Sequence, residues 1–259
     1  MLRMKILALS GILLAGILSQ RGFSQPANSP AATADKPDGS EAGKPTLYIF
    51  SGLGADERIF GRLNFNEFRP VFIQWVPPLE AEDMQAYARR IAGQIAEPEP
   101  MLLGVSFGGM MAIEVAKWKP CKKIVIVSSA KTGAELAASD NLFLRWKLYH
   151  KIPSSVLGSA NFFVNRLFGV ENKEDRALLR SILADTDIRF FRWAMDQMLQ
   201  WDNQLIPERL LHIHGGRDRI IPLTNLHPDI TIPDAGHFMI WNRAGLLQAY
   251  ITEYLNRNE

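Results

Sequence analysis

The stretch 101–111, MLLGVSFGGMM, limits most tightly how this chain can fold. The apolar run 101–105 predicts a buried strand, and the run 108–117 predicts a helix. Between them, 104–108 fits the pattern G-x-S-x-G around Ser106. Small residues two places before and two after a serine let the chain approach itself closely, which a sharp and strained strand-to-helix turn requires. We therefore expect this turn to lift the Ser106 hydroxyl clear of a sheet.

The motif alone is weak, because glycine and serine are common residues, so its setting matters. Short apolar or β-branched runs predict further strands, and periodic stretches predict further helices. The predicted strands are 46–50, 71–76, 101–105, 123–127, 209–214 and a short one within 227–232, and the predicted helices around them are 81–96, 108–117 and 241–255. Continuous apolar strands that alternate with helices favour the α/β class, here a mostly parallel open sheet of about six strands flanked by helices.

The stretch at about 131–207 interrupts this alternation, because it contains no convincing strand. Four parts of it are predicted to be helices with bulky faces: 142–149, 161–168, 173–184 and 188–199. We interpret 131–207 as a helical cap inserted over the carboxyl edge of the sheet. Most of its many aromatic side chains are expected to form the core of the cap, and a minority to line a pocket.

The N-terminal stretch 1–24 has the pattern of a signal peptide. Arg3 and Lys5 precede an apolar run that is short for a membrane span, and Gly22 and Ser24 suit cleavage before Gln25. The stretch 25–45, rich in Pro, Ala, Ser and Gly, is predicted to be a disordered linker, which leaves 46–259 as the folded domain. The expected location is periplasmic or secreted, or anchored at the N-terminus if the signal stays uncleaved.

The charge of the chain gives no reason to expect a nucleic-acid partner. The formal net charge is +2 for 259 residues. Residues 1–24 hold three basic and no acidic residues, so the rest carries 26 basic against 27 acidic, or −1. No basic patch with interleaved aromatic residues occurs. Apart from the export signal, we expect no membrane partner either.

Three chemically matched side chains follow three different predicted strands: Ser106, Asp218 and His237. The carboxyl edge of an open parallel sheet is where ligands bind, so we expect the three to meet there. A serine needs a base to take its proton, and histidine suits that task near neutral pH. A carboxylate fixes the imidazole tautomer and stabilises the imidazolium as it forms.

The chain resembles the α/β-hydrolase superfamily over about 45–259. The motifs that carry the resemblance are GVSFGG at 104–109, HGGRDRIIP at 214–222 and AGHF at 235–238. The resemblance implies that Ser106 is the nucleophile, Asp218 the acid and His237 the base. It also implies an oxyanion hole made by the backbone N–H groups of Phe107 and of Leu53, or a neighbour within 51–54.

The sequence departs from the superfamily pattern in two places. Many members carry His-Gly where this chain has Ser51 and Gly52, so the first oxyanion donor is less clearly marked. The usual leading antiparallel pair of strands is also missing, and the linker takes its place. Neither departure affects the three motifs.

Rival assignments have weaker settings. Asp229 and Asp234 could supply the acid, but the first lies in or before its strand and the second suits a turn. His212 and His214 alternate along a strand and are interpreted as structural. The lone Cys121 allows no intrachain disulfide and is interpreted as a small hydrophobic residue. No metal or dinucleotide motif occurs, so we expect neither a metal ion nor a cofactor.

These residues predict an exported serine hydrolase that cleaves a small-molecule carboxylic ester or thioester through an acyl-enzyme on Ser106. The same triad serves carbon–carbon bond hydrolysis and acyl transfer, and both stay open. A serine at the turn disfavours dehalogenation, which uses an aspartate there. The alternative of another class is a non-catalytic, hydrolase-like protein that binds a small ligand. The natural substrate and the oligomeric state also stay open.

Overall fold

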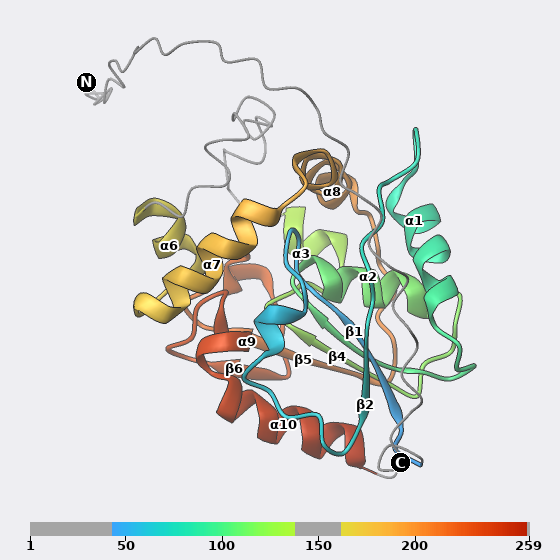
Figure 1. Ribbon diagram of the computed structural model, residues 1–259. Helices are drawn as coiled ribbons and strands as arrows, with labels where there is room; N and C mark the ends of the chain where they lie inside the picture. The colour runs from blue at the N-terminus through green and yellow to red at the C-terminus, as the bar shows by residue number, and fades with distance from the viewer. Residues whose placement is uncertain (1–42, 138–161, 258–259) are drawn as a thin grey trace, which may run out of the picture. The chain divides into compact units, whose positions relative to one another are not determined.

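The computed structural model describes residues 43–137 and 162–257, and a six-stranded sheet runs through its centre (Figure 1). All the strand pairs are parallel, and the order across the sheet is β2-β1-β3-β4-β5-β6. The strands are β1 (Thr46–Phe50), β2 (Arg69–Phe72), β3 (Met101–Val105), β4 (Lys123–Val127), β5 (Leu210–Gly215) and β6 (Ile230–Ile232). The α/β class and the parallel sheet predicted from the sequence are confirmed.

Strand β2 differs from its prediction, 71–76, because it begins and ends earlier. Pro70 lies inside the strand, opposite Leu47 of β1. A proline cannot donate a ladder hydrogen bond, but β2 is an edge strand and pairs on one side only, so the missing N–H is tolerated there. After Phe72 only Ile73 keeps a backbone bond to β1, with its N–H 2.8 Å from the Ile49 oxygen.

The helices of the fold cover both faces of the sheet. Helix α1 is shorter than the predicted 81–96: it starts after Asp83, whose side chain accepts from the Ala86 N–H, and passes into a 3-10 turn at Ala92. The helices outside the cap are α1 (Met84–Ile91), α2 (Phe107–Ala116), α9 (Met239–Asn242) and α10 (Ala244–Asn256), with the 3-10 turns η1 (Glu57–Phe60), η2 (Ala92–Gln94) and η4 (Leu223–Asn225). In Figure 1, α1 and α2 lie on one face and α10 lies on the other.

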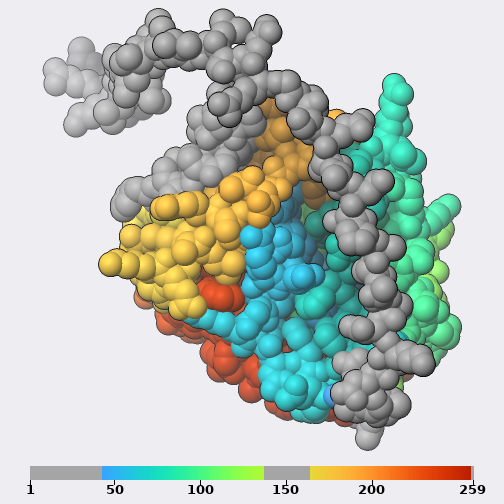
Figure 2. All heavy atoms as spheres, viewed as in Figure 1, coloured from blue at the N-terminus to red at the C-terminus, as the bar shows by residue number. Residues whose placement is uncertain are grey.

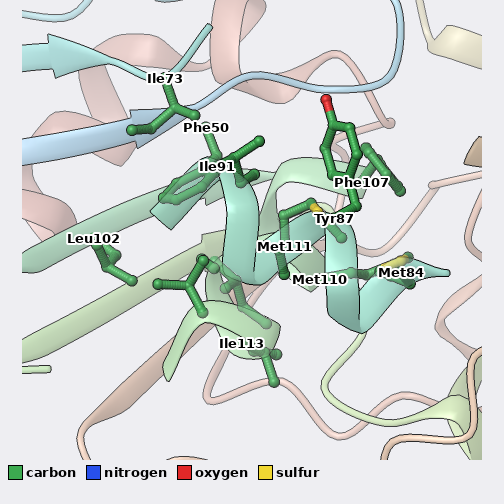
Figure 3. Packing of buried hydrophobic residues seen from close by; sticks show 14 of the residues in the cluster. Phe50, Ile73, Met84, Tyr87, Ile91, Leu102, Phe107, Met110, Met111 and Ile113 are labelled. Carbon is green, nitrogen blue, oxygen red and sulfur yellow. The ribbon is translucent and has the colours of Figure 1, made fainter. Parts of the chain in front are cut away.

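Two hydrophobic cores follow from this layering, one on each face of the sheet. The first packs α1 and α2 against side chains such as Phe50 and Leu102, and Figure 3 shows Tyr87, Met110 and Met111 within it. The second packs α9, α10 and η1 against the opposite face. Helix α2 is buried on nearly all sides, which explains why its sequence is apolar except for Glu114 rather than amphipathic.

Between β4 and β5 the described residues form helices and loops but no strand. They are α3 (Gly133–Ala137), α6 (Phe162–Phe168), α7 (Lys173–Asp185) and α8 (Ile188–Gln200), and the last three agree with the predicted ranges. They contact loops at the carboxyl edge of the sheet: the Thr186 hydroxyl donates to the Gly54 carbonyl at 3.0 Å, and the Phe168 carbonyl accepts from the Phe238 N–H at 2.9 Å.

Four predictions fall partly or wholly outside the described residues: the signal peptide at 1–24, most of the linker at 25–45, the helix at 142–149 and the part 138–161 of the predicted cap. No helix in the described part of the chain combines the length and the apolar character that crossing a membrane demands.

Candidate active site

Ser106 stands at the turn between β3 and α2 in a conformation that few non-glycine residues adopt. Its φ is 55° and its ψ is −122°. The surrounding structure holds this strain in place. The Ser106 N–H donates to the Val127 carbonyl at 2.9 Å, and the Ser129 hydroxyl donates to the Ser106 carbonyl at 2.7 Å. Both ends of the Ser106 backbone are therefore fixed by the neighbouring strand β4 and the residues after it.

The glycines of the motif are sterically required. A Cβ at Gly104 would lie 2.5 Å from the Gly108 carbonyl oxygen, and a Cβ at Gly108 would lie 2.2 Å from the Ser51 carbonyl oxygen. At Gly109 a Cβ would lie 2.5 Å from the Ser129 hydroxyl. The first two contacts are with backbone, which cannot move aside cheaply. The chain therefore approaches itself closely at these glycines, as the sequence predicted.

Ser106, His237 and Asp218 form one hydrogen-bonded line at the carboxyl edge of the sheet. His237 Nε2 lies 3.0 Å from Ser106 Oγ, and His237 Nδ1 lies 2.7 Å from Asp218 Oδ2. All three residues are buried. The carboxylate can only accept, so Nδ1 carries the ring hydrogen and Nε2 is left to accept the serine proton. This tautomer is the one that a general base needs.

The Asp218 carboxylate is held by several donors in a buried position. Its Oδ1 accepts from the N–H groups of Ile220 and Ile221, at 2.8 and 2.9 Å. Burial alone would raise the pKa of this carboxyl, but the charge and hydrogen bond of His237, together with His214, outweigh it, and the pKa lies below its ordinary value of 3.8. Asp218 therefore stays ionised and fixed in orientation at neutral pH.

His212 and His214, interpreted from the sequence as structural, form a buried chain that ends beside Asp218. His214 Nε2 donates to the Ile221 carbonyl at 2.9 Å and lies 3.4 Å from Asp218 Oδ2. With its hydrogen on Nε2, His214 accepts at Nδ1 from His212 Nε2, 3.3 Å away. Burial lowers the pKa of His214, and burial with the neighbouring His214 lowers the pKa of His212 to about 3. Both rings are therefore neutral at pH 7.

The rival acids have other partners. Asp229 Oδ2 accepts from the His212 backbone N–H at 2.7 Å, and the exposed Asp234 pairs with Arg243 at 3.1 Å. Of the three candidate acids only Asp218 contacts His237. Ser129, which lies close to His212, donates its hydroxyl hydrogen to the Ser106 carbonyl.

The loop after β1 lies against Ser106, as the oxyanion prediction requires. A Cβ built at Gly52 would lie 3.7 Å from the Ser106 Cβ. The Phe107 N–H belongs to the first residue of α2, where a helix leaves its amides without internal partners. Leu53 is half-buried against the core that contains Phe107. The catalytic use of these two N–H groups stays a prediction.

A tryptophan that the sequence did not single out fixes this loop. The Trp75 indole N–H donates to the Ser51 hydroxyl at 2.8 Å, and that hydroxyl donates to the Ala55 carbonyl at 2.7 Å. The Ala55 N–H in turn donates to the Gly52 carbonyl at 3.0 Å. Ser51, which stands where many relatives have histidine, therefore has a structural role. The signal available in the sequence was a tryptophan at the end of the predicted strand 71–76, just before Pro77 and Pro78.

Aromatic rings from the cap pack against the residue that follows the serine. Phe190 and Trp193 of α8 contact the Phe107 ring edge-on, with centroids 6.1 and 6.4 Å apart. Trp75 and Tyr87 complete the same cluster. Helix α8 of the cap therefore packs through aromatic side chains on α1 and on the start of α2, next to the turn that carries Ser106.

No three His, Cys, Asp or Glu side chains in 43–137 and 162–257 gather in a way that could hold a metal ion. Cys121 is half-buried, and burial raises the pKa of its thiol to about 12, so the thiol stays protonated at neutral pH. Its side chain behaves as the small hydrophobic residue predicted from the sequence.

Solved structures of known proteins share this fold. A hydrolase from Oleispira antarctica superposes with a TM-score of 0.67 at 14% identity, over 83% of this chain and 92% of that one. An N-acyl homoserine lactonase, AidH, gives 0.64 at 16% identity, over 83% and 91%. A thermophilic esterase from Thermogutta terrifontis gives 0.63 at 18% identity, over 82% and 90%. At these identities the likeness shows the fold alone.

Sequence comparison gives the family. No curated protein has a significant match to the sequence. The sequence model described as "Alpha/beta hydrolase family" matches residues 9–249, which is most of the chain. With the six-stranded parallel sheet and the three motifs in their expected order, the resemblance predicted from the sequence is confirmed, and the chain belongs to the alpha/beta hydrolase family.

Proposed function

We propose that the protein is a serine hydrolase that cleaves carboxylic esters or thioesters, with Ser106 as nucleophile, His237 as base and Asp218 as the orienting acid. The observation that carries the proposal is that the three side chains are hydrogen-bonded in series. Ser106 Oγ lies 3.0 Å from His237 Nε2, and His237 Nδ1 lies 2.7 Å from Asp218 Oδ2, while the Ser106 backbone has a strained, positive φ. Each partner comes from the end of a different strand, so the whole sheet supports their relative positions.

The first half of the proposed reaction forms an acyl-enzyme. His237 Nε2 takes the hydroxyl proton as Ser106 Oγ bonds to the acyl carbon, and the carbonyl oxygen becomes an oxyanion. The backbone N–H groups of Leu53 and Phe107 donate to it, an interaction worth about 10²–10³ in rate for each donor in comparable sites. As the carbonyl re-forms, the bond to the alcohol or thiol breaks, and His237 gives that group its proton.

The second half releases the acid. Water attacks the acyl carbon while His237 takes one of its protons, and a second oxyanion forms in the same place. The bond to Ser106 Oγ then breaks, and His237 returns the proton to the serine. The ionised Asp218 stabilises the imidazolium in both halves, and the low pKa of this carboxyl keeps it charged for that task.

One further observation favours an ester over other acyl compounds. The similar structures include an esterase and an N-acyl homoserine lactonase, and a lactone is a cyclic ester. A small-molecule ester is therefore the substrate class that we propose.

We also propose that the protein is exported. The support is the sequence alone: two basic residues, an apolar run of signal-peptide length and small residues before Gln25. N-terminal sequencing of the protein recovered from the periplasm or the medium tests this. A mature N-terminus near Gln25 agrees with the proposal, and full-length protein confined to the cytoplasm contradicts it.

Hydrolysis of nitrophenyl esters, from acetate to palmitate, tests the proposed activity. We expect turnover by the wild-type protein and a loss of about 10³-fold or more in Ser106→Ala. Ser181→Ala is the matched control, because this serine lies on α7 and contacts Arg58, not the triad. Equal rates in the wild type and Ser106→Ala would exclude Ser106 as nucleophile. A folded protein without turnover on any ester would favour carbon–carbon cleavage or ligand binding.

A further inference from the structure

A cavity of about 560 Å³ lies on the side of the His237 loop where α6 and α7 meet it. Its walls come from α6, α7, the loop after β5 and the residues just before His237, including Gly236. In Figure 2, red atoms of the C-terminal part of the chain reach the surface directly beside the yellow atoms of these cap helices. The volume lies within the range of small-molecule binding sites.

Five of the eleven residues that line this cavity are arginines, and none is a lysine. Arg176 and Arg180 are four positions apart on α7 and so share one face of that helix. Arg217 and Arg219 flank Asp218 in the loop after β5, and Arg166 lies in the last turn of α6. Elements far apart in the sequence therefore contribute arginines, all of them solvent-exposed, to the lining of one cavity.

Within 43–137 and 162–257, no carboxylate forms an ion pair with any of these five arginines. The two acids in the cavity wall, Glu171 and Asp234, both pair with Arg243, at 2.7 and 3.1 Å.

The acids next to Arg176 on α7 are also engaged elsewhere. Glu174 pairs with Arg62 at 2.7 Å, and the buried Asp175 accepts from the Trp241 indole at 3.1 Å. The cavity thus holds five positive against two negative lining groups in a chain whose formal net charge is only +2. Such a concentration of like charge repels itself unless an anion enters it.

Hydrogen bonds join the elements that form the walls of the cavity. Arg219 Nη1 donates to the Arg166 carbonyl at 2.9 Å, which ties the loop after β5 to α6. The Asn242 side chain donates to the Gly169 carbonyl at 3.0 Å, and a Cβ at Gly169 would lie 3.0 Å from the Gly236 Cα. The cap therefore meets the His237 loop through close backbone contacts, and the five exposed arginines lie around this junction.

We propose that this cavity binds a phosphate group, carried by a soluble phosphate ester or by a lipid headgroup. A guanidinium is a planar fork that matches phosphate oxygens in pairs, which fits a wall of arginines without lysine. A phosphate monoester carries more negative charge than a single carboxylate and three oxygens to bind, so it suits several arginines better. The inference goes beyond the proposed function, because binding here does not require Ser106 to react.

Calorimetric titration tests the proposal in full-length Ser106→Ala protein, which removes interference from turnover. The probes are glycerol 3-phosphate and, separately, phosphatidylcholine vesicles with and without phosphatidic acid, whose headgroup is a phosphate monoester. We expect glycerol 3-phosphate, or the vesicles that contain phosphatidic acid, to bind, and affinity to fall about tenfold or more in Arg176→Gln/Arg180→Gln. Binding of glycerol 3-phosphate indicates a soluble ligand, and binding of anionic vesicles alone indicates a headgroup.

A matched pair of exposed arginines outside the cavity, Arg189→Gln/Arg209→Gln, is the control and is expected to bind as before. Arg176→Lys/Arg180→Lys keeps the charge and separates fork-like recognition from simple attraction, and an intermediate affinity is expected. Absence of binding by both probes, or equal losses in the Gln pair and its control, would overturn the proposal. Because the readout is binding, failure of the ester assay does not affect it.

Discussion

At the scale of single residues, the reactivity proposed for Ser106 depends on groups that hold their neighbours rather than touch a substrate. Asp218 fixes the tautomer of His237 through the 2.7 Å bond to Nδ1. Two backbone N–H groups and the nearby His214 fix Asp218 in turn. These contacts keep His237 Nε2 oriented toward the Ser106 hydroxyl. Correct orientation contributes more to the rate than the strength of any one of these hydrogen bonds.

Replacing the acid tests this support. Asp218→Asn keeps the shape of the side chain but can hold His237 in the wrong tautomer, so we expect kcat on nitrophenyl acetate to fall about 10³–10⁴-fold with the fold intact. Asp229→Asn is the control, because Asp229 accepts only from the His212 backbone and an amide oxygen can still do so. Similar losses in both variants would contradict the assignment of Asp218.

His214 offers a second test at this scale. His214→Phe removes the Nε2 donor that lies 3.4 Å from Asp218 Oδ2, and we expect kcat to fall about tenfold with little change in KM. His214→Gln can keep a donor in that place and is expected to recover most of the rate. Steady-state kinetics on the same ester measures both, and equal rates in the two variants would mean that His214 only fills space.

Residue identities in the triad could be predicted from the sequence, because each stands in a motif after an apolar strand. The supporting contacts could not. The Trp75–Ser51 bond joins residues 24 positions apart, and the His212–His214–Asp218 chain depends on the register of β5 and the loop that follows it. Side-chain geometry of this kind is set by packing, which a one-dimensional pattern does not contain.

At the scale of elements, the site depends on a strand-to-helix turn that only glycine-rich chains can make. Strands β1, β3 and β4 begin and end where the sequence predicts, because they are central and continuously apolar. Strand β2 and helix α1 depart from the predicted ranges. Strand β2 includes Pro70 because it lies at the edge of the sheet. Helix α1 does not begin at residue 81, because Ala81 has a positive φ, and it starts only after the cap residue Asp83.

The turn itself gives a stability prediction. Gly108→Ala forces a Cβ to 2.2 Å from the Ser51 carbonyl oxygen, and we expect the free energy of unfolding to fall by about 3 kcal/mol or more. Gly93→Ala is the control, because no atom lies within 4 Å of its Cβ position, and it is expected to leave stability unchanged or slightly raised. Urea unfolding of both variants measures this, and equal midpoints would show that the turn relaxes freely.

At the scale of the whole molecule, one sheet carries both the core and the candidate site, so stability and activity share determinants. The parallel sheet and the helical cap could be predicted, since strand and helix periodicities differ clearly along this chain. Which aromatic residues of the cap pack beside Phe107 could not be predicted. In the sequence, Phe190 and Trp193 look like the other bulky residues of the cap, and only the packing of α8 distinguishes them.

The buried histidines predict how the whole fold responds to acid. The pKa of His212 falls from 6.5 to about 3 on folding, and burial lowers that of His214 as well. Between pH 6.5 and about 3 the unfolded chain therefore binds more protons than the native one, so stability rises with pH across this window and is lost on acidification. His212 adds a slope of about 1.4 kcal/mol per pH unit within this window, and His214 acts in the same direction.

Urea unfolding from neutral pH down to about pH 4 tests this dependence. We expect the midpoint to fall steadily on acidification in the wild type and less steeply in His212→Gln, which keeps a donor at the Nε2 position but cannot take up a proton. The exposed His227→Gln is the control and is expected to follow the wild type. A midpoint in the wild type that does not change over this range would contradict burial of neutral histidines.

The most direct test of Ser106 as the nucleophile is covalent labelling with a fluorophosphonate, followed by mass spectrometry of the digested protein. We expect a single adduct on the peptide that contains Ser106, formed quickly by the wild type and at least about 10³-fold more slowly by His237→Ala, because the serine then lacks its base. An adduct on Ser129 or another serine, or equal labelling rates in the two proteins, would contradict it.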